Sequence, residues 1–199
     1  MFVQIIEGRV TDRDALRRRF DLWATELRPA AEGFLGSTGG ITADGRAIVM
    51  ARFASAEAAA ANSARPEQGA WWADTEVCFD GSPTFAESTD VDLFLKGGDD
   101  SAAFVQVMKV PDADRVRTAE LDELLETEMT TIRPEVMGGL RAWTGPNRYV
   151  EAVYFTSEAA ARAGEAKELP HKLQEAFAEV GAMMESAEYL DLTDPWIRS

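Results

Sequence analysis

An internal repeat is the feature that most limits how this sequence can fold. Phe2-Val3-Gln4-Ile5-Ile6 returns as Phe104-Val105-Gln106-Val107-Met108, at an offset of 102 residues. Phe53-Ala54-Ser55 precedes an alanine-rich run and returns, at the same offset, as Phe155-Thr156-Ser157. Between these matches, Arg28-Pro29 returns as Arg133-Pro134. Separated matches in the same order indicate two copies of one structural unit.

We therefore predict two domains, residues 1–98 and 102–199. The segment between them, Lys96-Gly97-Gly98-Asp99-Asp100-Ser101, has the Gly and Asp content of a short exposed linker.

Each copy has the pattern of a β-α-β-β-α-β unit. An amphipathic helix follows the first strand, and in copy one Thr11 or Asp12 can cap it. A second helix begins at Ser55 or Ser157 and continues beyond a proline. The clearest strands are expected over residues 2–7, 47–53 and 90–95, and over residues 103–110, 149–155 and 187–192. This order is the ferredoxin-like motif, so the expected fold class is α+β, with two tandem repeats and antiparallel sheets.

A ferredoxin-like sheet carries its helices on one face, so its other face needs cover. Two copies in one chain can press their bare faces together and close an intramolecular α+β barrel. A ligand would then bind in the cavity between the sheets. We expect a monomer closed in this way and leave a further homodimer open.

Composition removes several classes of function. The formal net charge is −15, which repels phosphate backbones and anionic membranes, so we expect neither a nucleic-acid nor a membrane partner. The sequence has one cysteine, Cys78, and one histidine, His171, which excludes a metal site built from clustered Cys or His residues. No signal peptide is recognisable at the start, and a cytoplasmic location is expected.

Several segments resemble the antibiotic-biosynthesis-monooxygenase group of the dimeric α+β barrel superfamily. They are the openings FVQIIEG and FVQVMKV, the strand-to-helix joints RFASAEAAAA and YFTSEAAARA, and the stretch RPEQGAWWAD. The resemblance implies a small hydrophobic or aromatic ligand. Some members of this superfamily oxygenate activated phenols without metal or flavin, and others degrade haem.

Side-chain alternation along the strands predicts which residues line the cavity. If Val3 and Ile5 face the helices, the cavity side of copy one carries Phe2, Gln4, Ile6, Ile48, Met50 and Arg52. The corresponding side of copy two carries Phe104, Gln106, Met108, Val150, Ala152 and Tyr154. Copy one also has the pair Trp71-Trp72, so we expect the working pocket to lie nearer copy one.

From this set we take Gln4, Arg52 and Trp72 as catalytic candidates. The substrate-binding candidates are Phe2, Ile6, Met50, Asn62, Trp71, Gln106 and Tyr154. Structural roles remain open for all of them. Gln4 and Gln106 can pair with each other, Arg52 can form a salt bridge, and the tryptophans can fill a core. His171 can be a general base, an axial haem ligand or a surface residue.

Three functions remain open. The first is a monooxygenase that needs no cofactor and acts on a small aromatic or polyketide-like substrate. The second is a non-catalytic protein that binds a small hydrophobic ligand. The third is haem binding or haem breakdown.

Overall fold

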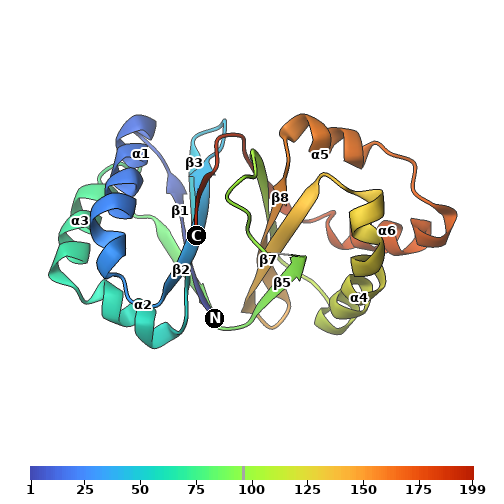
Figure 1. The fold of residues 1–199 in the computed structure, drawn as a ribbon, viewed down its shortest axis with the longest axis horizontal. Coiled ribbons are helices and arrows are strands. Elements are labelled where there is room, and N and C mark those ends of the chain that lie inside the picture. Colours follow the sequence, from blue (N-terminus) through green and yellow to red (C-terminus); the bar gives the residue numbers. More distant parts are fainter. Residues whose placement is uncertain (96) are drawn as a thin grey trace. The chain divides into compact units, whose positions relative to one another are not determined.

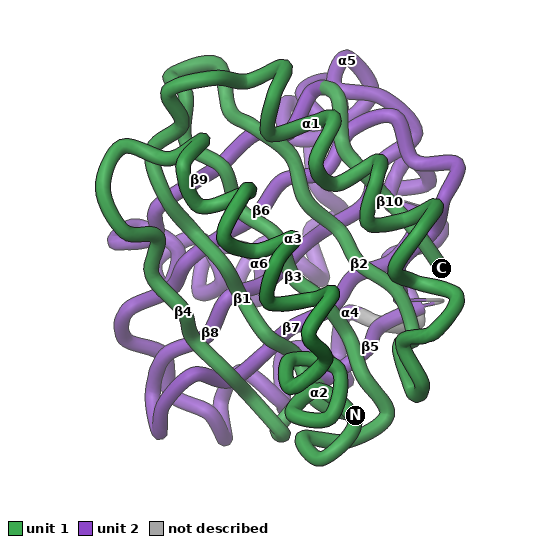
Figure 2. Tube along the Cα trace, turned by 90° about the vertical axis from the view of Figure 1, so that its left-hand side faces the viewer, with its two compact units in different colours: residues 1–91, 194–199 green, residues 92–193 purple. Residues whose placement is uncertain are grey.

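The computed structural model describes residues 1–95 and 97–199 (Figure 1) and divides the chain into two compact units, which Figure 2 shows in different colours. Unit 1 comprises Met1–Val91 together with Asp194–Ser199, and unit 2 comprises Asp92–Thr193. This division differs from the predicted domains 1–98 and 102–199, because the C-terminal residues belong to unit 1 and unit 2 begins at residue 92. The predicted linker begins at Lys96, which lies outside the described residues.

Unit 1 contains a five-stranded antiparallel sheet in the order β10-β2-β3-β1-β4. Its strands are β1 (Phe2–Arg9), β2 (Phe34–Ile41), β3 (Arg46–Phe53), β4 (Thr84–Ser88) and β10 (Trp196–Arg198). Unit 2 contains a second five-stranded sheet in the order β5-β7-β8-β6-β9. Its strands are β5 (Val91–Leu95), β6 (Phe104–Val110), β7 (Val136–Gly145), β8 (Arg148–Phe155) and β9 (Glu188–Leu192).

One strand assignment from the sequence was wrong. Residues 90–95 were expected to close the sheet of copy one, but β4 pairs with β1 in that place, and β5 pairs with β7 in the sheet of unit 2. β4 follows a turn-rich stretch around Gly81 and Pro83, and its sequence lacks a clear alternation of apolar residues. Most of its residues are exposed, which is why the sequence did not reveal it as a strand. Each repeat therefore ends in an additional strand that belongs to the sheet of the other repeat.

Several helices begin at capping residues that the sequence identifies. They are α1 (Arg13–Leu22), α2 (Ala56–Ser63), α3 (Pro66–Glu76), α4 (Arg115–Ile132), α5 (Glu158–Glu165) and α6 (His171–Met183). Asp12, Ser55 and Ser157 accept hydrogen bonds from backbone amides three residues later, which satisfies the first turns of α1, α2 and α5. α1 continues into a π-helical turn (Trp23–Leu27) and a 3₁₀ turn (Arg28–Ala30).

Figure 1 shows α1, α2 and α3 beside the strands of unit 1, and α4, α5 and α6 beside those of unit 2. The predicted fold class is thus confirmed, since the chain is an α+β protein of two ferredoxin-like repeats with antiparallel sheets. Barrel closure and the oligomeric state stay predictions. None of the described helices combines the length and apolar composition that a membrane crossing requires.

The sheet register corrects the predicted faces of unit 1. Phe2 lies opposite Phe53, and both pack with Ala59 of α2, so this row of β1 faces the helices. Phe2, Gln4 and Ile6 therefore face the helices, not the opposite side of the sheet as predicted. Met50 and Arg52 do lie on the side away from the helices, because they pair with Ile5 and Val3. The prediction combined two faces because it assigned each strand separately, without the register that joins them.

The same correction applies in unit 2. Phe104 lies opposite Phe155 and packs with Ala161 of α5, which turns Phe104, Gln106 and Met108 towards the helices. Val150, Ala152 and Tyr154 lie on the other face, and Tyr154 is completely buried there.

Two glycines offer a matched test of packing. A Cβ atom on Gly139 would lie 1.7 Å from the ring of Phe94, whereas a Cβ on Gly69, within α3, meets nothing within 4 Å. We expect Gly139→Ala to destabilise the protein by about 1–3 kcal/mol because the ring must move. Gly69→Ala should stabilise it by up to about 1 kcal/mol through helix propensity. Denaturant unfolding of both variants checks this pair, and equal effects would contradict the close approach of Phe94 to β7.

Candidate functional site

A cavity of about 970 Å³ lies within unit 2, between the helix-facing side of its sheet and helices α4 and α6. Its walls are largely apolar and rich in aromatic and methionine side chains, including Phe94, Met108, Leu125, Trp143, Phe177 and Met184. The volume is at the upper end of the range for small-molecule sites, and such sites are also mostly apolar. Unit 2 can therefore hold a ligand of several fused rings.

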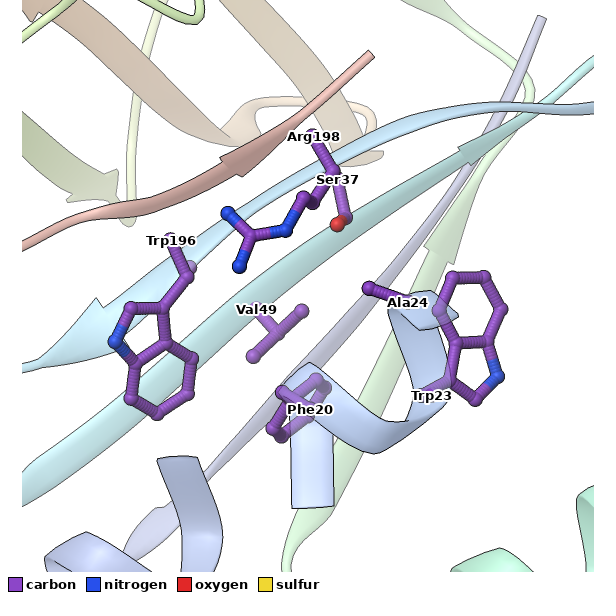
Figure 3. A pocket seen from close by; sticks show the side chains of 8 residues that line it. Phe20, Trp23, Ala24, Ser37, Val49, Trp196 and Arg198 are labelled. Atoms are coloured by element: carbon purple, nitrogen blue, oxygen red, sulfur yellow. The ribbon is translucent and has the colours of Figure 1, made fainter. Parts of the chain in front are cut away.

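The corresponding space in unit 1 is filled. The pocket there measures about 20 Å³, which is close to the space that one water molecule needs. Phe20, Val49 and Trp196 converge on it (Figure 3), and the rings of Phe20 and Trp196 lie 5.4 Å apart. A ligand-sized cavity therefore lies in copy two, whereas the working pocket was expected nearer copy one.

The two spaces are equivalent positions of the repeat. Phe20, Gly39 and Val49 line the small pocket of unit 1. An offset of 102 residues converts these positions into Asp122, Arg141 and Glu151, and all three line the large cavity of unit 2. At these three positions unit 1 has uncharged residues, whereas unit 2 has three charged residues. We call Asp122, Arg141 and Glu151 the charged trio.

The charged trio joins the sheet to helix α4. Arg141 of β7 and Glu151 of β8 lie directly opposite each other, with 2.9 Å between Arg141 Nη2 and Glu151 Oε1. Both Nη atoms of Arg141 also bond the carboxylate of Asp122 on α4. The side chains of Arg141 and Glu151 are 7% and 5% exposed, whereas Asp122 is 51% exposed. Arg141 Nε is buried and has no hydrogen-bond partner among the described residues.

Burial raises the pKa of the Glu151 carboxyl above its ordinary value, and Arg141 offsets this effect only in part. Burial and the neighbouring charge of Glu151 also raise the pKa of the Tyr149 hydroxyl. A carboxylate with a raised pKa is a stronger base, and a buried guanidinium can stabilise negative charge that develops beside it. The charged trio can therefore accept a proton and stabilise the resulting anion within one apolar cavity.

Two further polar contacts border the cavity, one at each edge of the sheet. The Gln106 amide donates to Asp191 of β9 over 2.9 Å, and Asp191 also pairs with Arg162 of α5. Trp143 Nε1 donates to Asp92 over 2.8 Å. These bonds fix the orientation of the polar groups that border the cavity.

Of the predicted site residues, only Gln106 lines this cavity among the residues that the structure describes. Gln4 and Gln106 do not pair with each other, since each donates to a carboxylate on the adjacent strand; Gln4 reaches Glu87 over 3.2 Å. Arg52 is buried, with no hydrogen-bond partner for its Nε among the described residues. Met50 is buried beside it on the same face, and Phe2 and Ile6 lie in the core of unit 1.

The remaining candidates have identifiable structural contacts. Trp71 donates to the carbonyl of Arg19 over 2.8 Å, and Trp72 packs against Phe79 and Phe85. Asn62 is buried and accepts a hydrogen bond from Arg65 over 3.0 Å. His171 is exposed at the first turn of α6 and is not a wall residue of the cavity, so its position gives the haem hypothesis no support.

Arg141 and Glu151 were missed by sequence reasoning, although a signal was present. Each interrupts an otherwise apolar strand, in the stretches LRAWT and YVEAVYF. Comparison of the repeats at the 102-residue offset would have shown that copy one has Gly39 and Val49 in these places. Among the described residues, no three or more His, Cys, Asp or Glu side chains come together in a way that could hold a metal ion.

Solved structures with the same fold span nearly the whole chain. A putative monooxygenase from Lactobacillus acidophilus NCFM matches with a TM-score of 0.72 at 13% identity, over 98% of both chains. A putative monooxygenase from Fusobacterium nucleatum subsp. nucleatum matches with a TM-score of 0.76 at 11% identity, over 100% of this chain and 94% of that one. An anthrone oxidase-like protein matches with a TM-score of 0.62 at 11% identity, over 99% and 89%.

These identities are so low that the matches show a shared fold alone. At the level of sequence, no protein-family description and no curated protein matches this chain.

Proposed function

We propose that this chain is a monooxygenase that uses no metal or flavin and oxidises a small aromatic substrate in the cavity of unit 2. One observation carries the proposal: the ligand-sized cavity has a buried Arg141–Glu151 pair where the other repeat has Gly39 and Val49. Buried ion pairs are often no more stabilising than apolar residues of similar volume. Since unit 1 folds with an apolar set, the fold does not require the charged trio, and a chemical role accounts for it.

The proposed reaction converts an activated CH₂ group of an aromatic ketone or phenol into C=O. Glu151 removes a proton, and the resulting carbanion or enolate transfers electrons to O₂ and forms a C–O bond. The peroxide anion takes the proton back from Glu151 and then loses water, so one oxygen atom enters the product and the other leaves as H₂O. The substrate supplies all four electrons, and no external reductant is needed.

The chain's own groups have separate tasks in this reaction. Glu151 is the base, and its raised pKa suits that task. Arg141 stabilises the oxygen on which negative charge develops. The apolar walls exclude water from the reactive anion. The matches to putative monooxygenases and to an anthrone oxidase-like protein support this reaction class, and they make anthrone a reasonable first substrate to test.

Glu151→Gln tests the base directly. With anthrone as substrate, we expect the variant to lower the rate of O₂ uptake by about 10²–10⁴-fold, because the amide cannot accept the proton. Glu87→Gln in unit 1 is the matched control and should leave the rate unchanged, since Glu87 lies on the exposed strand β4 beside Gln4. An oxygen electrode, with the quinone product followed by absorbance, gives both rates. Equal rates in wild type and Glu151→Gln would contradict the assignment of the base.

The same cavity also suits a protein that binds a small hydrophobic ligand without turnover. That alternative predicts saturable binding of anthrone but no O₂ uptake by the wild type. The oxygen-electrode experiment therefore distinguishes the two functions.

A further inference from the structure

The charges around the cavity of unit 2 limit the charge of its ligand, an inference that rests on the function proposed above. Six carboxylates and four guanidiniums line the cavity, which gives it a formal net charge of −2. The whole chain has a formal net charge of −15. The net charge of the whole chain and the net charge of the cavity wall are therefore both negative, and both oppose the entry of an anion.

The guanidiniums on the wall are already engaged. Arg141 is held by Asp122 and Glu151, and Arg162 by Asp191 and Glu165. Arg133 pairs with Glu135, and Arg115 lies over the ring of Trp143, with its Cζ 4.5 Å from the ring centroid. At Arg133, Arg141 and Arg162, a ligand carboxylate would have to displace an existing carboxylate.

Two uncharged donors on the wall are also engaged. Trp143 Nε1 and the Gln106 amide donate to Asp92 and Asp191. Since Glu151 already balances the charge of Arg141, the cavity offers an anion no uncompensated positive charge there, and an uncharged ligand fits best.

We infer that the site binds aromatic ligands in their uncharged form and rejects aromatic carboxylates of the same size. This selection is compatible with the proposed chemistry. When Glu151 takes a proton from a neutral substrate, one negative charge moves from the glutamate to the substrate oxygen. The charge beside Arg141 then stays constant through the reaction, whereas an anionic ligand would add a second negative charge.

Two probes with the same ring system test the inference: 2-acetylnaphthalene and 2-naphthoate. Titration calorimetry of the full chain should give the ketone a dissociation constant at least about tenfold lower than that of the carboxylate. Trp143 is the single tryptophan of unit 2, and the other four lie in unit 1, so it reports which unit binds. Quenching by the ketone should be lost in Trp143→Phe.

Two variants that each remove one negative charge from the cavity wall test whether that charge repels 2-naphthoate. Glu151→Gln should strengthen 2-naphthoate binding by about tenfold and change ketone binding by less than about threefold. Asp122→Asn should shift 2-naphthoate binding in the same direction by a smaller factor. Asp122 is half-exposed, so this variant retains the fold if Glu151→Gln does not.

The outcomes separate the two proposals. If wild type binds 2-naphthoate as tightly as the ketone, the inference is overturned and the proposed function stands. If the ketone is preferred but anthrone causes no O₂ uptake, the proposed function fails and the inference stands. If quenching by the ketone persists in Trp143→Phe, the ligand binds in unit 1 and the inference is overturned.

Discussion

Replacing Arg141 by alanine is expected to lower the free energy of unfolding by about 3–5 kcal/mol at neutral pH. The variant leaves the Glu151 carboxylate 5% exposed and without its counter-charge. Asp122, the remaining acidic member of the charged trio, would add repulsion. Denaturant unfolding followed by circular dichroism measures the loss. Lys172→Ala is the control, since this lysine pairs with Glu128 at the surface of unit 2 and is 64% exposed, and the change there should be within about 0.5 kcal/mol.

A second substitution should restore the loss. Val49 shows that the fold accepts valine at the position equivalent to Glu151. Arg141→Ala combined with Glu151→Val should therefore be within about 1 kcal/mol of wild type, because no buried charge remains. A double variant as unstable as Arg141→Ala alone would mean that the arginine stabilises unit 2 through packing and not through charge compensation.

The loss should also depend on pH. Burial raises the folded-state pKa of Glu151 above its ordinary value of 4.5, and removal of Arg141 raises it further. A raised carboxyl pKa penalises the folded state above the unfolded-state pKa, because the unfolded chain can then ionise the group more easily. The deficit of Arg141→Ala should be largest at neutral pH and shrink as the pH falls towards 4.5. Unfolding curves at several pH values check this trend.

The ordinary rules of local structure were sufficient for most of the fold. Asp12, Ser55 and Ser157 cap the helices they were expected to cap, and α3 begins at Pro66. The 102-residue offset then predicted the helices and strands of the second repeat from those of the first. What local rules could not supply was pairing. β5 has the composition of a strand, but its partner β7 lies more than 40 residues away, and only the tertiary structure identifies it.

The site was harder to predict for a related reason. Gln4 and Gln106 look alike in sequence and both face helices, yet only Gln106 borders a ligand-sized space. The difference arises from the volume between sheet and helices. In unit 1 this space is occupied by Trp23 and Trp71, whose Nε1 groups are satisfied by Gln68 and by the Arg19 carbonyl. The tryptophan pair that suggested a pocket in copy one belongs to the aromatic core that fills it.

Trp196→Ala is expected to destabilise unit 1 by about 3–5 kcal/mol, the usual cost of removing a large buried aromatic side chain. Trp196 is 6% exposed and belongs to the cluster of Leu16, Ala47, Cys78 and Phe79. Its ring lies 5.4 Å from that of Phe20, and β10 pairs with β2 through Trp196 and Gly39. The substitution therefore opens a cavity and weakens the edge strand that the chain's last residues supply.

The loss of stability in Trp196→Ala should be confined to unit 1. In a Trp143→Phe background, the remaining tryptophans all lie in unit 1 and report its unfolding. Their transition should shift to lower denaturant concentration in Trp196→Ala, whereas Val77→Ala, a residue that is 73% exposed, should shift it by no more than about 0.5 kcal/mol. Ligand binding at Trp143, measured with Trp143 retained, should not change, because the cavity lies within unit 2. An unchanged transition in Trp196→Ala would show that the C-terminal strand is not part of the core of unit 1.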